Sequence, residues 1–78
     1  MPRYFLHLVD GERFVDEEGH DLADLESARQ QAVRSARSIM ADEISNGRLA
    51  LTPTIEIVSE AGQLLLSLRF ADSIQIEE

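Results

Sequence analysis

Residues 24–46, DLESARQQAVRSARSIMADEISN, form the stretch that decides the fold. Apolar residues recur there at spacings of three or four positions, which is the period of a helix with one buried face. Asp24 is a suitable N-cap, and Glu26 adds a negative charge in the first turn, where the helix dipole favours it. Gly47 supplies a stop after the last turn. The predicted apolar stripe consists of Leu25, Ala28, Ala32, Ala36, Ile39, Met40 and Ile44.

A strand hairpin is predicted on each side of this helix. Residues 3–15 have the pattern of a hairpin, because aromatic and aliphatic residues flank the turn dipeptide Asp10-Gly11. Residues 54–70 follow the same plan of strand, glycine turn and strand. The remaining segments are an acidic loop at residues 16–23 and a short C-terminal segment at residues 71–78, which either adds an edge strand or frays.

The order strand, strand, helix, strand, strand predicts one α+β domain over residues 1–78. We expect two layers, an antiparallel sheet of four strands with one long helix packed on one face. Side chains alternate between the two faces of a strand, so each strand contributes every second residue to the core. The set predicted for the core face is Tyr4, Leu6, Leu8, Ile55, Ile57, Leu64, Leu66, Leu68 and Phe70.

One helix is too narrow to cover such a sheet. Four strands span roughly 19 Å, whereas a helix with its side chains covers about 10–12 Å. The opposite face still offers apolar residues, and scattered surface apolars on a monomer are the ordinary alternative. We therefore expect a non-enzymatic interaction module that forms a homodimer or binds another protein through this outer face. Its interface candidates are Phe5, Val9, Val58 and Leu65.

The composition limits the classes of partner. The chain has 15 Asp and Glu residues against 7 Lys and Arg, a formal net charge of -8, so nucleic acid is a poor candidate partner. Without cysteine, the chain has no disulfide, no thiolate zinc site and no thiol nucleophile. No apolar stretch is long enough for a signal peptide or a membrane span, so we expect a cytoplasmic protein with no membrane partner.

The acidic loop holds the densest group of oxygen atoms that could bind a hard cation. It lacks the alternating ligands, central glycine and distal glutamate of an EF-hand. We therefore interpret it as a solvated charge run that keeps a small protein soluble, and we expect no metal site. A small ligand- or metal-binding regulator is the alternative, and its candidate ligands are Asp16, Glu17, Glu18, His20 and Asp21.

No catalytic group stands out in the sequence. His7 and His20 are the only histidines, and neither forms a recognisable catalytic spacing with an acid. The serines and threonines lie outside any Gly-Xaa-Ser-Xaa-Gly motif, and no glycine-rich phosphate cradle occurs. We expect no enzyme activity, no catalytic residues and no cofactor.

Three arginines on the helix suggest a second alternative function. Arg29, Arg34 and Arg37 are residues that a nucleic-acid-linked regulator would use on phosphates. Asp42 and Glu43 follow on the same helix, and ion pairs on the helix surface are the ordinary explanation for such arginines.

Several short motifs together carry a resemblance to a family. They are MPRYFLH at residues 1–7, the Asp10-Gly11 turn, DEEG at residues 16–19, Asp24-Leu25 ahead of the helix, and IEIV at residues 55–58. In combination they resemble an uncharacterised family of short bacterial proteins, frequent in alphaproteobacteria, that begin Met-Pro-Arg-Tyr-Phe. The family is described as a domain of unknown function. The resemblance therefore implies a compact cytoplasmic bacterial domain and transfers no catalytic residues.

Overall fold

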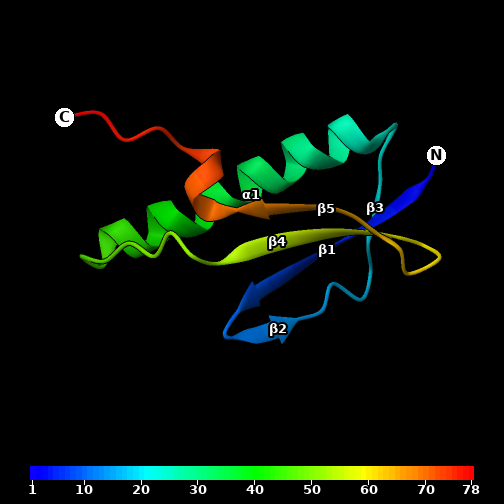
Figure 1. Cartoon of the computed structure of the whole chain (residues 1–78), viewed down its shortest axis with the longest axis horizontal. Helices are drawn as coiled ribbons and strands as arrows, with labels where there is room; N and C mark the ends of the chain where they lie inside the picture. The colour runs from blue at the N-terminus through cyan, green and yellow to red at the C-terminus, as the bar shows by residue number, and fades with distance from the viewer.

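The computed structural model describes residues 1–78 and has an antiparallel sheet with one long helix beside it (Figure 1). This arrangement confirms the predicted α+β fold with a helix between two strand hairpins. The elements in chain order are β1 (Arg3–Asp10), β2 (Glu12–Phe14), β3 (His20–Asp21), α1 (Leu25–Ser45), β4 (Thr54–Ser59), β5 (Leu64–Arg69) and the 3₁₀ helix η1 (Phe70–Ser73).

The four main strands are ordered β2-β1-β4-β5, and every pairing is antiparallel. The prediction of four strands omitted β3, a two-residue strand inside the acidic loop that pairs with Arg3 and Tyr4 of β1. One edge of β1 thus pairs with β4, and the other edge pairs with β2 at one end and β3 at the other. Residues 5–7 have no strand partner on that second edge.

Helix α1 begins and ends where its capping residues predict. The carboxylate of Asp24 accepts a hydrogen bond from the N–H of Ser27 at 2.8 Å, and Gly47 has a φ of 80° just after the helix. No helix in the structure combines the length and apolar character needed to cross a membrane. The buried face of α1 consists of Ala28, Ala32, Ala36 and Met40.

The predicted apolar stripe of α1 is wider than the face that is buried. Leu25 is 37% exposed, Ile39 36% and Ile44 59%. A helix of 21 residues is about 31 Å long, whereas a six-residue strand is about 20 Å long, and the C-terminal turns of α1 extend beyond the strands (Figure 1). The periodicity of the stripe therefore located the helix correctly and overestimated its contact with the sheet.

A register shift in the last hairpin changes which leucines face the core. Ile57 pairs with Leu66, but the next residue, Val58, pairs with Leu64, so Leu65 is an extra residue on β5. Leu65 packs against the core, whereas Leu64 is 53% exposed on the outer face beside Val58. The predictions for these two leucines were wrong, because strict alternation fails at a β-bulge.

The helix packs over β4, β5 and η1 and leaves the β1–β2 side of the same face less covered (Figure 1). Ile55 and Ile57 of β4 are 3% and 0% exposed, as expected for residues under the helix. Their neighbours on β1, Leu8 and Leu6, are only half-buried. Phe14, which pairs with Leu8, is 53% exposed. We call Leu6, Leu8 and Phe14 the helix-side strip.

The bulge predicts that an alanine substitution lowers the stability of the fold more at Leu65 than at Leu64. Leu65→Ala should lower the free energy of unfolding by about 1–3 kcal/mol, because it removes part of the core. Leu64→Ala should cost about 0.5 kcal/mol, as expected for an exposed side chain. Urea denaturation followed by circular dichroism measures both values. A larger loss for Leu64→Ala would contradict the register described above.

Candidate functional site

The loop between β2 and β3 is organised around the carboxylate of Asp16. This carboxylate accepts hydrogen bonds from the backbone N–H groups of Leu6 at 3.1 Å, Gly19 at 3.0 Å and Glu18 at 3.3 Å. Leu6 lies on the part of β1 that has no strand partner on this edge. The Asp16 side chain therefore supplies the acceptor that a neighbouring strand would otherwise provide.

Both histidines contact Asp16. The Nδ1 atom of His7, a residue that is 8% exposed, accepts the backbone N–H of Asp16 at 3.0 Å. The Nε2 atom of His20 lies 3.4 Å from Oδ2 of Asp16. The ring of His7 also stacks on Phe5, with 6.4 Å between the ring centroids. These contacts give both histidines a structural role in holding the loop on the sheet.

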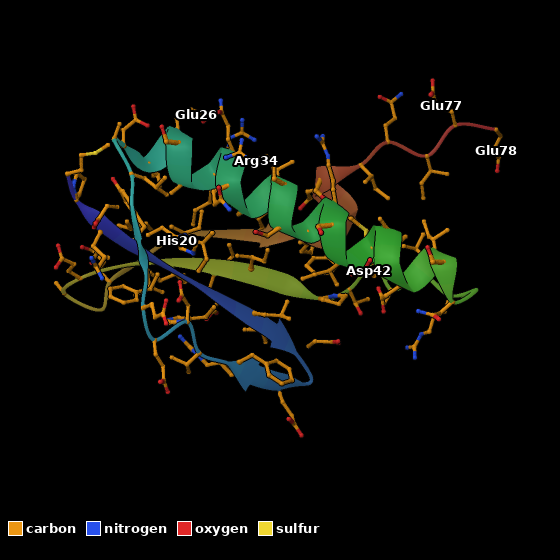
Figure 2. The ribbon with its side chains drawn as sticks, turned by 180° about the vertical axis from the view of Figure 1, so that it is seen from behind. His20, Glu26, Arg34, Asp42, Glu77 and Glu78 are labelled. Atoms are coloured by element: carbon orange, nitrogen blue, oxygen red, sulfur yellow. The ribbon has the colours of Figure 1, made fainter.

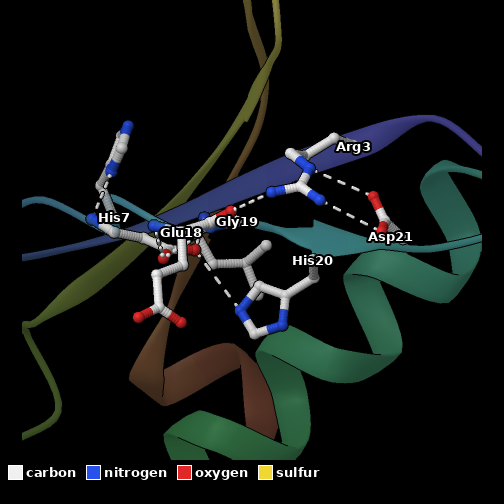
Figure 3. A network of polar contacts seen from close by, with 8 residues as sticks. Arg3, His7, Glu18, Gly19, His20 and Asp21 are labelled. Carbon is white, nitrogen blue, oxygen red and sulfur yellow. Dashed lines mark hydrogen bonds and ion pairs between the residues drawn. The ribbon is translucent and has the colours of Figure 1, made fainter.

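Arg3 ties the far end of the loop to β1 (Figure 3). Its guanidinium donates to both carboxylate oxygens of Asp21, at 3.1 and 3.2 Å, and to the backbone carbonyl of Glu18 at 2.6 Å. Gly19 has a φ of 75°, and a Cβ at this position would lie 2.9 Å from both Cγ of Arg3 and Cε1 of Phe5. The loop backbone thus packs directly on the outer face, in space where only glycine fits.

The environment of Asp16 favours its ionised form. Burial raises the pKa of this carboxyl, but the hydrogen bonds from Gly19 and Leu6, the charge of His20 and the hydrogen bond from Glu18 outweigh burial. The pKa of Asp16 is therefore lowered from its ordinary value. A carboxylate held in this way stabilises the folded state at neutral pH.

The five candidate metal ligands do not converge on one point. No group of three or more His, Asp or Glu side chains is arranged to hold a metal ion. Asp16 is occupied by backbone N–H groups and Asp21 by Arg3. Glu17 and Glu18 are exposed, which fits the interpretation as a solvated charge run, but the Asp16 side chain is only 18% exposed and lies outside that interpretation. The Asp-x-x-Gly spacing of Asp16 and Gly19 was the sequence signal for this structural role.

Three of the four predicted interface residues lie on the outer face. Phe5 pairs with Val58, and Val9 lies on the same face of β1, whereas Leu65 lies on the helix side. Phe5 and Val9 are half-buried, and Val58 is 8% exposed. An ion pair of 3.2 Å between Arg13 and Glu56 covers part of the same face. The apolar area left open there is smaller than the sequence suggested, and exposed Leu64 belongs to it.

The helix-side strip was absent from the predicted interface, although its residues were assigned to strands. Phe14 follows Arg13 on β2, so the two side chains point to opposite faces of the sheet. The sequence places Phe14 on a strand, but its exposure depends on where the helix lies across the sheet.

Arg29, Arg34 and Arg37 all line one cavity between α1 and η1, together with Asp72 and Ser73.

The lowered pKa of Asp16 predicts how stability depends on pH. An unfolded Asp titrates near pH 3.9, so the contribution of Asp16 is complete above about pH 5 and is lost as pH falls through the lower pKa of the folded state. Asp16→Asn should lower the free energy of unfolding by about 1–3 kcal/mol at neutral pH. The difference from the wild type should shrink below about pH 4. Urea titrations across pH test this, with exposed Glu17→Gln as the control. A pH-independent difference would contradict the role of the ionised carboxylate.

The packing of Gly19 predicts an unusually costly alanine. Gly62→Ala, at a φ of 85° with open space around it, should cost about 1–2 kcal/mol from backbone strain alone. Gly19→Ala has the same kind of strain and adds the clash with Arg3 and Phe5, so it should cost at least about 1 kcal/mol more. Melting temperatures and urea midpoints compare the two variants. Equal losses would show that the loop does not pack closely on the outer face.

Comparisons with known proteins place the chain in a family without adding an activity. The model of a family described as "Domain of unknown function (DUF6894)" matches residues 3–71. A search of the curated proteins gave no match, and neither did a search of the solved structures. The match covers most of the chain, from the start of β1 into η1. The chain therefore belongs to the DUF6894 family of domains of unknown function.

Proposed function

We propose that this domain is a non-enzymatic interaction module that forms a homodimer through the helix-side strip. The observation that carries the proposal is the off-centre position of α1, which leaves apolar side chains open on the face that also forms the core. Leu6 and Leu8 contact the buried core on one side and remain half-buried on the other. A second copy placed there would extend an existing core, and obligate homodimer interfaces resemble a domain core cut in half.

Exposed side chains at the edge of this strip add to the proposed surface. Phe14 is 53% exposed and Val15 is 58% exposed, and aromatic residues are frequent at the centres of protein interfaces. β2 itself is a short edge strand whose three residues are all exposed.

The roles of the histidines and carboxylates favour a binding module over an enzyme. His7 and Asp16 are engaged in holding the β2–β3 loop, and Asp21 is engaged by Arg3. A general base or a metal ligand needs a free lone pair that faces a substrate or an ion. The proposal includes a cytoplasmic location. The chain has no cysteine and therefore no disulfide that would need an oxidising compartment.

The proposal makes a prediction about charge as well as mass. Each copy has a formal charge of -8, so two copies repel each other at long range. Added salt screens this repulsion, and an apolar interface persists in salt. Dimerisation should therefore strengthen between low and moderate ionic strength. Light scattering after gel filtration, over a concentration series, should give twice the chain mass of 8.7 kDa.

Two serine substitutions locate the interface, because Phe14 and Leu64 have the same exposed fraction, 53%, on opposite faces. Phe14→Ser should convert the dimer to a monomer with little loss of stability, and Leu64→Ser should leave the mass unchanged. If Leu64→Ser dissociates the dimer instead, the interface is the outer face around Phe5 and Val58. A wild-type monomer at every concentration would contradict self-association.

A further inference from the structure

A cavity of about 280 Å³ lies between α1 and η1, and three of its seven lining residues are arginines. Arg29, Arg34 and Arg37 come from successive turns of α1, and Asp72 and Ser73 come from η1. Val33 is the single hydrophobic residue in the lining. The cavity therefore gathers three of the seven basic residues of an acidic chain at one place.

Two of these arginines have no carboxylate partner. Arg29 is neutralised by Glu26, whose Oε2 lies 2.8 Å from its Nε atom. Arg34 donates to the amide oxygen of Gln31 at 2.9 Å, and Arg37 donates from Nε to the carbonyl of Ser73 at 2.7 Å. Neither forms a salt bridge within 4.0 Å, although the chain contains 15 acidic residues. Their charges are thus free for an external anion.

The acidic groups near the cavity are engaged or turned away. Oδ2 of Asp72 lies 3.5 Å from Nε of Arg69, which offsets its charge. The C-terminal residues Glu77 and Glu78 lie on a tail that runs away from Arg34 (Figure 2). The cavity therefore has a local charge near +2 from Arg34 and Arg37, while the whole chain has a charge of -8.

The side chains are also held in place for binding. The hydrogen bond from Arg37 to η1 fixes its Nε atom and leaves its two terminal nitrogens as donors. Gln31 fixes one nitrogen of Arg34 in the same way. A guanidinium held at one end presents a planar fork that matches two oxygens of a phosphate or carboxylate group. Less side-chain entropy is then lost when an anion binds.

We propose that this cavity binds a small dianionic ligand through its phosphate group, with Arg34 and Arg37 as the two forks. A dianion balances the two unpaired charges, and the tetrahedral phosphate accepts hydrogen bonds from two directions, whereas a single carboxylate lies in one plane. The volume is near the lower limit for small-molecule pockets and suits a phosphate with a small organic part against Val33. A nucleic acid fits less well, because a polyanion meets the repulsion of the entire acidic chain.

The first probe is inorganic phosphate added to the full-length chain at constant ionic strength, with chloride as the reference. NMR of the arginine Nε–H groups should show saturable shifts for Arg34 and Arg37 in the millimolar range. The melting temperature should rise with phosphate concentration, because a ligand bound only by the folded state stabilises it. A linear, unsaturable response equal to that of chloride would overturn the proposal.

Three variants separate a specific site from a general salt effect. Arg34→Gln removes one fork at an exposed position, and Arg37→Lys keeps the charge but removes the planar fork. Each should weaken phosphate binding at least about tenfold, which corresponds to about 1.4 kcal/mol. Arg48→Gln is the control, because Arg48 is also exposed and unpaired but lies outside this cavity. Equal effects of all three substitutions would overturn the site.

Two further binding experiments identify the chemical class of the anion. A phosphate monoester should bind more tightly than a dicarboxylate of similar size, and the reverse order would overturn the assignment of phosphate. Binding of a DNA duplex with a steep salt dependence, at lower concentration than the monoester, would replace the small ligand with nucleic acid. Neither arm depends on the oligomeric state, so failure of the proposed dimer leaves this test intact.

Discussion

The width of a single helix is the constraint on which the surface of this protein depends. A helix with its side chains covers about 10–12 Å, and the four paired strands span roughly 19 Å. Ala28, Ala32 and Ala36 let α1 approach β4 and β5 closely, and their complete burial places the centre of the core there. The β1–β2 side of the sheet consequently has only partial cover. The same off-centre position leaves room for η1 beside α1, where the arginine cavity forms.

The outer face of the sheet is covered in part by the β2–β3 loop and not by a second long helix. Asp16 occupies the gap along β1 between the pairings of β2 and β3, and its carboxylate replaces the missing strand acceptor. The loop backbone then packs on Phe5 at Gly19, while Arg3 closes the far end. A partly buried carboxylate that accepts three backbone hydrogen bonds is a stable arrangement, because the backbone donors offset the loss of water. Some of the acidic residues of this loop therefore hold the fold together.

The charges of the chain are separated along the fold. Acidic residues gather in the β2–β3 loop, where Arg3 and His20 meet some of them. Arg34 and Arg37 lie on α1 against η1, and neither forms a salt bridge within 4.0 Å. Because exposed charges beyond about 8 Å are largely screened at physiological salt, a local positive site can persist on a protein of charge -8. The two proposals thus use separate surfaces, an apolar strip at β1–β2 and a basic cavity at α1–η1.

The sequence by itself determined the elements whose signals are local. Asp24 and Gly47 marked the ends of α1, and the Asp10-Gly11 turn marked the first hairpin, because capping and turn formation involve residues within a few positions of each other. The family resemblance likewise rested on short motifs, and the family match confirmed it at the level of a domain of unknown function.

The tertiary structure decided the features that depend on how distant segments pair. The bulge opposite Val58 exchanged the faces of Leu64 and Leu65, and no property of those two identical residues could signal it. The exposure of Phe14 depends on the lateral position of α1 over the sheet. The gathering of the helix arginines into a cavity depends on η1, which follows them by more than 30 residues. Register and lateral position are set by packing across the whole domain, so periodicity within one segment cannot determine them.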